Sequence, residues 1–236
     1  TEGLATSTGT GTSYEAGGGL HCDAESTMTI DSMVFTANSG ESGSGAFFSG
    51  GCDATISSTT FEANTSSDYG GGITQIDSVL TLTDVDFTDN TADHDSGGGA
   101  MRLGRLAETS ITGGTFSGNS APRGGGIYNN QAVLSLDSVT FDANTASAYG
   151  GAVYSTGTDT VTDCDFTDNT ADTGVGAYVV VEATADFSGG SFSGNSSPEA
   201  GALEFNDSTG TVDGPLRATA PPRRAPARST STPTPR

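Results

Sequence analysis

One tetrapeptide, Phe-x-x-Asn, recurs seven times along this chain of 236 residues and constrains its fold more than any other feature. Successive copies start 25 to 29 residues apart. A period of this size, held over most of a chain, is typical of stacked repeat architectures, in which each repeat buries its apolar residues against the next. The seven copies are Phe35/Asn38, Phe61/Asn64, Phe87/Asn90, Phe116/Asn119, Phe141/Asn144, Phe166/Asn169 and Phe192/Asn195.

A second motif, rich in glycine and ended by an apolar residue, lies between successive Phe-x-x-Asn copies. Glycine permits a positive φ or a close approach between backbones, so we expect it where neighbouring repeats touch. The clear copies of this glycine motif are 70–73, 98–101, 124–127 and 150–153, and the weaker copies are 17–20, 45–47, 176–178 and 201–203.

The residues before each phenylalanine predict short β-strands joined by a bend. Apolar residues predominate five and seven positions before the phenylalanine, as at Ile30 and Met28, and this alternation is typical of a half-buried strand. The alternation then changes phase, so the chain must bend before it reaches the phenylalanine. Asp-Ser at 31–32 and 137–138 supplies turn chemistry at that corner. No helical period of useful length is present.

These patterns predict an all-β fold, a single-stranded right-handed parallel β-helix of about seven to eight coils of 25–29 residues. Coils would stack about 4.8 Å apart. The phenylalanines would form an interior stack, and the asparagines would form a ladder of side-chain amide hydrogen bonds at a corner. The predicted stack is Phe35, Phe61, Phe87, Phe116, Phe141, Phe166 and Phe192, and the predicted ladder is Asn38, Asn64, Asn90, Asn119, Asn144, Asn169 and Asn195.

The paired motifs, GGA followed by Ile, Leu or Val and FxxN, resemble the repeats of the polymorphic outer membrane proteins of chlamydiae. Residues 150–153 fit the first motif strictly, and all seven Phe-x-x-Asn sites fit the second. The resemblance covers roughly residues 15–210. It implies a right-handed parallel β-helix that is secreted or surface-exposed, often adhesive, and associated with a bacterial outer membrane.

Charge divides the chain into a body and a tail. All 29 acidic residues precede Pro215, where three arginines leave the body with a formal charge of −26, and five arginines follow it. A body this acidic repels nucleic acid and anionic membranes, so we expect neither as a partner. No apolar run is long enough to span a bilayer. We predict a β-helix domain at 1–214, with an incomplete first coil, and a disordered Pro/Arg/Thr-rich tail at 215–236.

The tail also admits a second interpretation, a further repeat translated out of frame. Codons incompatible with the shifted reading would exclude it. This interpretation would leave the tail without a selected function.

The three cysteines allow one disulfide. Cys164 occupies a slot that Met33 and Val85 fill in other repeats, so we predict a buried thiol. Cys22 and Cys52 lie in neighbouring repeats at different offsets, which leaves a disulfide between them open. No spacing typical of a zinc site occurs.

Arg102, Arg105 and Arg123 are the basic residues of the body and mark the candidate for a chemical site. Arginine beside clustered carboxylates would suit a polysaccharide lyase or hydrolase. A local salt-bridge patch on an acidic surface explains the same residues, and we prefer it. The acidic residues near them in sequence are Asp93, Asp95 and Glu108.

Metal and cofactor chemistry receives little support from the sequence. We interpret His94 as a solvated loop residue rather than a base or a metal ligand. Aspartate-rich corners, such as 84–93, would suit Ca²⁺, but the calcium-binding β-helix repeat is absent. We therefore expect no cofactor and keep Ca²⁺ as an alternative.

An outward-facing column of threonine and serine lies six residues before the phenylalanines, as at Thr29 and Thr55. A Thr-x-Thr face on a flat β-helix would suit ice binding. Threonine also suits any exposed strand, and Asp31, Asp137 and Asp186 interrupt the face, so we prefer the structural explanation.

We expect a non-enzymatic cell-surface or secreted β-helix domain, a fragment of a larger repeat protein, with a structural or adhesive role. Its partners would be glycans or surface proteins of a host or neighbouring cell. The first alternative is a β-helix that binds or degrades polysaccharide, and the second is an ice-binding protein. A carboxylate cluster facing a groove beside Arg102, Arg105 or Arg123 would favour the first alternative, and smooth faces would favour adhesion.

Overall fold

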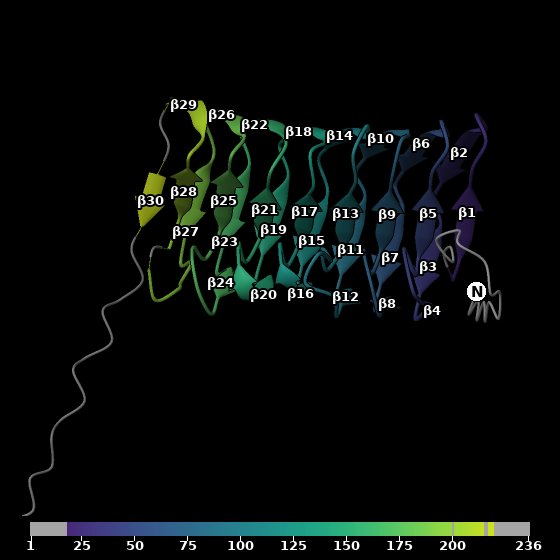
Figure 1. The fold of residues 1–236 in the computed structure, drawn as a ribbon, viewed down its shortest axis with the longest axis horizontal. Helices are drawn as coiled ribbons and strands as arrows, with labels where there is room; N and C mark the ends of the chain where they lie inside the picture. Colours follow the sequence, from purple (N-terminus) through teal and green to yellow (C-terminus); the bar gives the residue numbers. More distant parts are fainter. Residues whose placement is uncertain (1–17, 200, 215–216, 220–236) are drawn as a thin grey trace, which may run out of the picture.

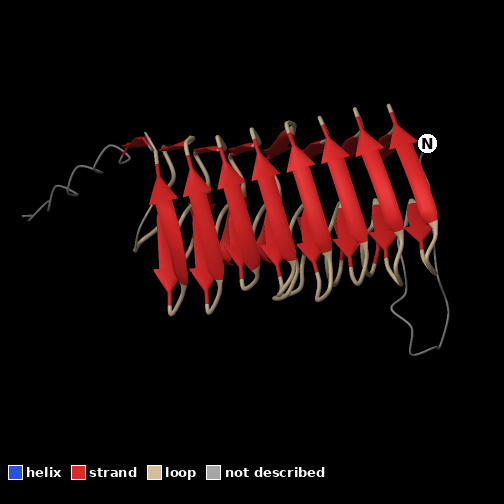
Figure 2. Cartoon of the chain, turned by 90° about the horizontal axis from the view of Figure 1, so that it is seen from above, coloured by secondary structure: helices blue, strands red, loops and turns tan. Residues whose placement is uncertain are grey.

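The computed structural model describes residues 18–199, 201–214 and 217–219. These residues form thirty β-strands and no helix. Four successive strands make each of the first six coils and three make each of the last two, and each strand pairs in parallel with its counterparts in the neighbouring coils (Figure 1). Seen from above, the strands lie side by side along the long axis (Figure 2). The predicted parallel β-helix is confirmed, and three of its four sheets contain eight strands.

The first sheet follows the glycine motif, and the second sheet carries the apolar alternation. The strands of the first sheet are β1 (Leu20–Cys22), β5 (Ala46–Phe48), β9 (Ile73–Gln75), β13 (Met101–Leu103), β17 (Ile127–Asn129), β21 (Val153–Ser155), β25 (Tyr178–Val181) and β28 (Leu203–Asn206). The strands of the second sheet are β2 (Thr27–Asp31), β6 (Asp53–Ser57), β10 (Val79–Thr83), β14 (Glu108–Thr112), β18 (Val133–Asp137), β22 (Thr158–Thr162), β26 (Thr184–Ser188) and β29 (Thr209–Asp213).

The third sheet carries the phenylalanines, and the fourth sheet follows the asparagines. The strands of the third sheet are β3 (Val34–Thr36), β7 (Thr60–Glu62), β11 (Asp86–Thr88), β15 (Thr115–Ser117), β19 (Thr140–Asp142), β23 (Asp165–Thr167), β27 (Ser191–Ser193) and β30 (Arg217–Thr219). The strands of the fourth sheet are β4 (Ser39–Gly40), β8 (Thr65–Ser66), β12 (Thr91–Ala92), β16 (Ser120–Arg123), β20 (Thr145–Tyr149) and β24 (Thr170–Ala171).

The tail is described only at 217–219, where β30 pairs in parallel with β27. The third sheet therefore continues past the predicted domain boundary at residue 214. The rest of the predicted tail and residues 1–17 of the predicted domain lie outside the described residues, as do the disordered and out-of-frame interpretations of the tail.

Each coil bends through residues in the left-handed region. One column of such residues joins the second sheet to the third, three positions before each phenylalanine, and its φ values run from +46° at Ser58 to +69° at Gly189. A second column lies between each phenylalanine and its asparagine, with φ from +51° at Asp168 to +67° at Gly194. Ser32 and Ser138, the serines of the Asp-Ser pairs, belong to the first column. These bends explain why the burial alternation changes phase.

The phenylalanines form one continuous stack in the interior. Neighbouring ring centroids are 4.6–5.1 Å apart and neighbouring rings lie within 19° of parallel. The stack begins at Phe35, which is partly buried, and continues through six fully buried rings to Phe192. Offset stacking of this kind adds about 0.5–1.5 kcal/mol per pair to the burial of each ring. The stack therefore ties every coil to its neighbours.

The asparagines form a buried ladder in which each side chain hydrogen-bonds a neighbouring asparagine along the stack. Asn119, for example, donates from its backbone N–H and from Nδ2 to Oδ1 of Asn144, at 3.1 Å and 2.9 Å. Its Nδ2 also donates to the Phe87 carbonyl at 2.9 Å, while its Oδ1 accepts the same two bonds from Asn90. The same pattern runs from Asn38 to Asn195.

Glycine is required where the fourth sheet turns into the first. A Cβ on Gly125 would lie 2.7 Å from the backbone nitrogen of Thr145 in the next coil, and Gly150 has a φ of +66°. Any larger residue at Gly125 would separate the coils, because a real Cβ does not approach backbone this closely.

Two pairs of buried polar side chains cross the interior near the corner between the first and second sheets. Thr109 Oγ1 donates to Gln75 Oε1 at 2.6 Å, and Asn129 Nδ2 donates to Asp159 Oδ1 at 2.6 Å. Each amide also bonds a carbonyl three residues onward, of Ser78 at 2.9 Å and of Ala132 at 3.3 Å. Burial raises the Asp159 pKa to about 6.

The cysteines divide into one disulfide and one thiol. Cys22 and Cys52 form a disulfide with their Cα atoms 5.9 Å apart, which resolves the alternative left open by the sequence. Cys164 is a buried free thiol, and burial raises its pKa to about 11.

Candidate functional site

Six side chains beside the first sheet belong to neither the phenylalanine stack nor the asparagine ladder. They include four of the six tyrosines of the chain. We call them the tyrosine–arginine face, which consists of Tyr69, Arg102, Arg123, Tyr128, Tyr149 and Tyr154.

Strand alternation places three of these side chains on the outer side of the first sheet. Arg102, Tyr128 and Tyr154 are the middle residues of β13, β17 and β21, and they are register partners in successive coils. Their strand neighbours, such as Met101 and Leu103, belong to the hydrophobic core. Because successive side chains of a strand point to opposite faces, the middle residues point outward.

The other three side chains stand directly before the glycine motif. Tyr69 precedes Gly70, Arg123 precedes Gly124 and Tyr149 precedes Gly150. Arg123 and Tyr149 are also register partners on β16 and β20. The glycines turn the chain into the first sheet at this point, and the side chains before them reach the outer side of that sheet.

Aromatic and cation–π contacts join the face across the coils. The guanidinium carbon of Arg102 lies 4.0 Å from the ring centroid of Tyr69, and that of Arg123 lies 5.5 Å from the ring of Tyr154. The Tyr154 ring is 5.4 Å from Tyr128 and 6.2 Å from Tyr149. Each cation–π contact is worth about 0.5–2 kcal/mol, depending on how far it is desolvated.

Arg102 is the most enclosed cation of the described chain. Its side chain is 8% exposed, and its Nε is buried without a hydrogen-bond partner. In the described residues the ion pair found joins His94 to Asp68, and no arginine pairs with a carboxylate. The preferred sequence interpretation, a salt-bridge patch around the arginines, is therefore wrong for the described part of the chain.

Tyr154 is a neutral phenol at physiological pH. Burial raises the Tyr154 pKa, and the positive charge of Arg123 opposes part of that rise. The ring therefore presents an uncharged aromatic surface beside a cation.

The other predicted residues lie apart from this face or make weak contacts beside it. Arg105 is exposed and follows the C-terminal end of β13, whereas Tyr69, Arg123 and Tyr149 precede the first-sheet strands. His94 is half exposed, lies 3.5 Å from Asp68, and meets the Tyr69 ring edge-on at 6.0 Å. Asp93, Asp95 and Glu108 are exposed. Among the described residues, no group of three His, Cys, Asp or Glu side chains is placed to bind a metal ion.

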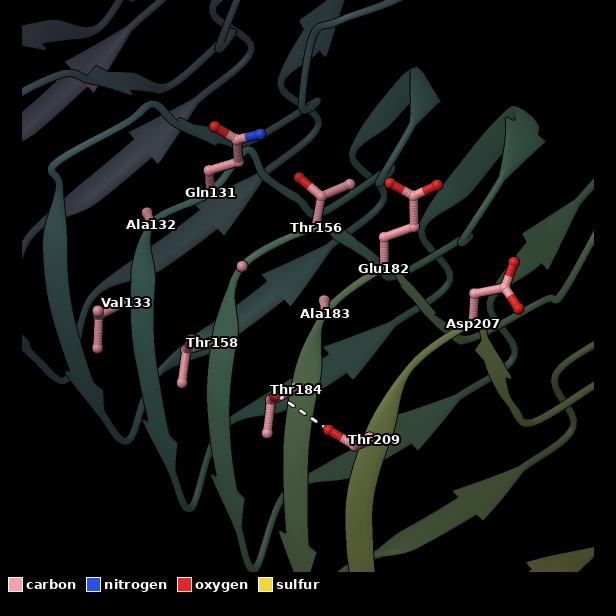
Figure 3. A pocket seen from close by; sticks show the side chains of 11 residues that line it. Gln131, Ala132, Val133, Thr156, Thr158, Glu182, Ala183, Thr184, Asp207 and Thr209 are labelled. Carbon is pink, nitrogen blue, oxygen red and sulfur yellow. Dashed lines mark hydrogen bonds between the residues drawn. The ribbon is translucent and has the colours of Figure 1, made fainter.

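A shallow groove of about 410 Å³ follows the corner between the first and second sheets in the later coils (Figure 3). Gln131, Thr156, Glu182 and Asp207 lie along one side of it, and Val133, Thr158, Thr184 and Thr209 lie along the other. Thr184 and Thr209 approach within 3.2 Å through their hydroxyls. The groove offers hydroxyls and carboxylates but no cation.

The outer face of the second sheet carries the predicted threonine column in register. Thr29, Thr55 and Thr81 are neighbours in successive strands, and all three are exposed. Further along the same column the residues are Ser110, Ser135, Thr160, Asp186 and Thr211.

Sequence reasoning identified Arg102 and Arg123 but missed the tyrosines. The available signal was the residue before the glycine motif, which is aromatic at Tyr69 and Tyr149. The middle position of the first-sheet strands was a second signal, with tyrosine in two successive coils at Tyr128 and Tyr154.

Comparison with known proteins supports the repeat assignment. Residues 113–130 and 138–156 match the model of the Chlamydia polymorphic membrane protein repeat. Each matched segment contains a Phe-x-x-Asn copy and a glycine motif, so the resemblance drawn from the motifs is confirmed. No curated protein matches the chain, and no solved structure does. The described residues include no helix with the length and apolarity of a membrane span.

Proposed function

We propose that this chain is part of a surface-associated repeat protein and that its β-helix presents the tyrosine–arginine face to an adhesive partner. The matched repeats are those of a membrane protein family, which supports a surface-associated protein. The adhesive role is supported by the face itself. Its contact partner would be a glycan or a surface protein of a host or neighbouring cell.

The composition and setting of the face carry this proposal. Tyrosine and arginine are the residues most enriched at binding hot spots, because each combines a large contact area with a polar group. Here they gather on one side of a rigid stack of coils. A rigid scaffold lowers the entropic cost of binding, since the contact residues are ordered before the partner arrives.

The disulfide supports a location outside the cytoplasm. Disulfides persist in oxidising environments, such as the bacterial periplasm and the cell surface, and are rare in the cytosol. Cys22 and Cys52 are joined in neighbouring coils near the first strands. An extracellular or outer-membrane-associated location follows as part of the proposal.

The adhesive role is tested by binding of the chain to a glycan array and to bacterial and host cell surfaces. We expect Tyr149→Ala combined with Tyr154→Ala to abolish binding. Arg105→Ala, which changes an exposed residue at the other edge of the sheet, serves as the control and should bind as the parent does. Equal binding by the double variant and the parent would remove the face from any adhesive role.

A polysaccharide-binding role is the second candidate, and the groove of Figure 3 favours it. Its hydroxyls and the Glu182 and Asp207 carboxylates would hydrogen-bond the hydroxyls of a neutral sugar chain. Thr158→Val combined with Thr184→Val should then weaken binding of a neutral polysaccharide. Product formation from polyuronates or neutral glycans would instead support an enzyme.

The register of the threonine column keeps ice binding as a third candidate. Asp186 interrupts the column. A thermal-hysteresis measurement on the full chain, with no hysteresis found, would exclude it.

A further inference from the structure

We propose that the tyrosine–arginine face binds a sugar that carries a single carboxylate on an otherwise neutral glycan. Arg123 would contact the carboxylate, and Tyr149 and Tyr154 would pack against the sugar ring. This inference depends on the adhesive function proposed above and names its ligand.

The first observation in favour of this ligand is that the arginines of the face form no ion pair within the described part of the chain. In the described residues no carboxylate pairs with Arg102 or Arg123, although acidic residues far outnumber arginines. Both guanidinium groups lie over tyrosine rings, and the buried Nε of Arg102 has no hydrogen-bond partner. A guanidinium forms paired, charge-assisted hydrogen bonds with a carboxylate. Arg102 is almost enclosed, whereas Arg123 is half-buried, so Arg123 offers the guanidinium that a ligand can reach and that no carboxylate of the described residues uses.

The second observation is that the face includes an exposed tyrosine ring on which a sugar can pack. Tyr149 is 40% exposed, and its ring lies against the backbone of Gly174 in the next coil, where a Cβ would collide with the ring. Gly174 also has a φ of +67°, which favours glycine. The Tyr149 ring is therefore supported from below and open above, beside Tyr154. A flat aromatic surface with a few polar groups at its edge is typical of small-ligand sites.

The third observation is the negative charge of the whole chain, which limits how many negative charges the ligand can carry. The formal net charge of −21 repels a polyanion at long range. Arg123 acts only at short range, so it favours an isolated carboxylate over a polymer that carries one on every sugar. A neutral glycan that ends in one acidic sugar satisfies both conditions.

The test is an array of glycans that end in sialic or glucuronic acid, each paired with the same glycan lacking the acidic sugar, and probed with the full chain. The pair 3′-sialyllactose and lactose is then measured by titration calorimetry. We expect acidic members to bind at least tenfold more tightly than their neutral parents. Arg123→Gln should remove that preference, and Arg105→Gln, the matched loss of an exposed charge, should keep it. Thermal melting verifies that both variants fold.

The outcomes separate this inference from the adhesive function. Equal binding of acidic and neutral glycans that is lost in Tyr149→Ala overturns the acidic ligand and retains the adhesive face. Polygalacturonate binding more tightly than every singly charged glycan overturns the charge argument and with it the proposed ligand class. Absence of all binding, to glycans and to cell surfaces, overturns both proposals.

Discussion

Asp159 places a carboxyl group inside the β-helix, in a slot that other coils fill with Leu80, Leu134 or Ala185. Its side chain is 1% exposed, and burial raises its pKa from 3.8 to about 6. Asn129 donates a hydrogen bond to one carboxyl oxygen, while the other has no partner that meets hydrogen-bond geometry. The Tyr178 hydroxyl lies close enough to interact with this carboxyl and is likewise without an aligned partner. Folding therefore favours the protonated acid.

The sign of the resulting pH dependence follows from the raised pKa. Between pH 3.8 and about 6 the folded state holds more protons at Asp159 than the unfolded state, so stability falls as the pH rises and stays low above that window. A shift of this size corresponds to about 3 kcal/mol. We predict that Asp159→Asn raises the free energy of unfolding at pH 8 by more than it does at pH 4. Urea denaturation of both proteins at the two pH values measures the difference, and an equal effect at both would contradict the buried charge.

The asparagine ladder makes a second prediction for a single residue. Asn119→Ala would leave the backbone N–H of Asn90 without a partner and its Nδ2 with the Phe61 carbonyl alone, while the Oδ1 of Asn144 would keep only the backbone N–H of residue 119. Each buried polar group that loses its partner costs about 1–3 kcal/mol. We expect Asn119→Ala to lower the free energy of unfolding by about 3 kcal/mol or more. Asn206→Ala, at an exposed position in β28, is the matched control and should change stability little.

At the scale of the element, aspartate in one coil is paired with glycine in the next. Both left-handed columns contain this arrangement, at Asp84 over Gly113 and at Asp89 over Gly118, and the same pairs recur three coils later. In each case a Cβ on the glycine would collide with the aspartate Oδ1. The sequence shows the same coupling, since TDVDFTDN precedes TGGTFSGN and TDCDFTDN precedes SGGSFSGN in neighbouring repeats. The repeats are therefore not interchangeable, because a coil with aspartate at these positions is followed by a coil with glycine.

A double-mutant cycle tests the coupling of Asp89 with Gly118. Gly118→Ala introduces both left-handed strain, about 1–2 kcal/mol, and a collision with the carboxylate. Ala143 tolerates the same conformation, with a φ of +52°, in the coil that follows. We therefore predict that Gly118→Ala destabilises less in an Asp89→Ala background, with a coupling of about 1 kcal/mol. Additive effects in the cycle would show that the carboxylate moves aside freely.

The elements also show how far the sequence could predict the fold. Phe61 and Phe87 occupy the same position in successive repeats. Parallel stacking of coils places residues at the same repeat position next to each other, so the phenylalanine stack could be predicted from the sequence alone. The two buried polar pairs, Gln75–Thr109 and Asn129–Asp159, could not be predicted from the repeat, because each pair joins residues at different repeat positions in different coils. Their partners are set by the corner between the first and second sheets, which no periodic count reveals.

The same limit applies to the candidate site. Arg102 and Arg123 were identified because arginine is rare in the body, yet the prediction paired them with carboxylates by proximity in sequence. Their actual partners are Tyr69 and Tyr154, which are more than 25 residues away from them in sequence. Proximity along this chain is a poor guide, because a neighbour in space is most often about 26 residues away in sequence.

At the scale of the whole molecule, the stack of coils behaves as a one-dimensional array in which each coil contacts only its neighbours. A covalent bond at one end of the stack should therefore stabilise mainly the coils that it joins. The Cys22–Cys52 disulfide closes a loop with a sequence separation of 30 between the first two coils, which corresponds to about 3–4 kcal/mol of chain entropy in the usual model. It lies where the first coil has a neighbouring described coil on one side only.

We predict that reduction of this disulfide frays the first coils and leaves the centre intact. Amide hydrogen exchange, followed with and without reductant, should show protection lost in β1 and β5 and retained in β17 and β21. The Cys22→Ser/Cys52→Ser variant is the control, because reductant should not alter its exchange. A loss of protection along the entire stack would show that the β-helix opens as one cooperative unit. In that case the bond at one end would govern the whole tyrosine–arginine face, from Tyr69 to Tyr154, and adhesion itself would become sensitive to the redox state of the surroundings.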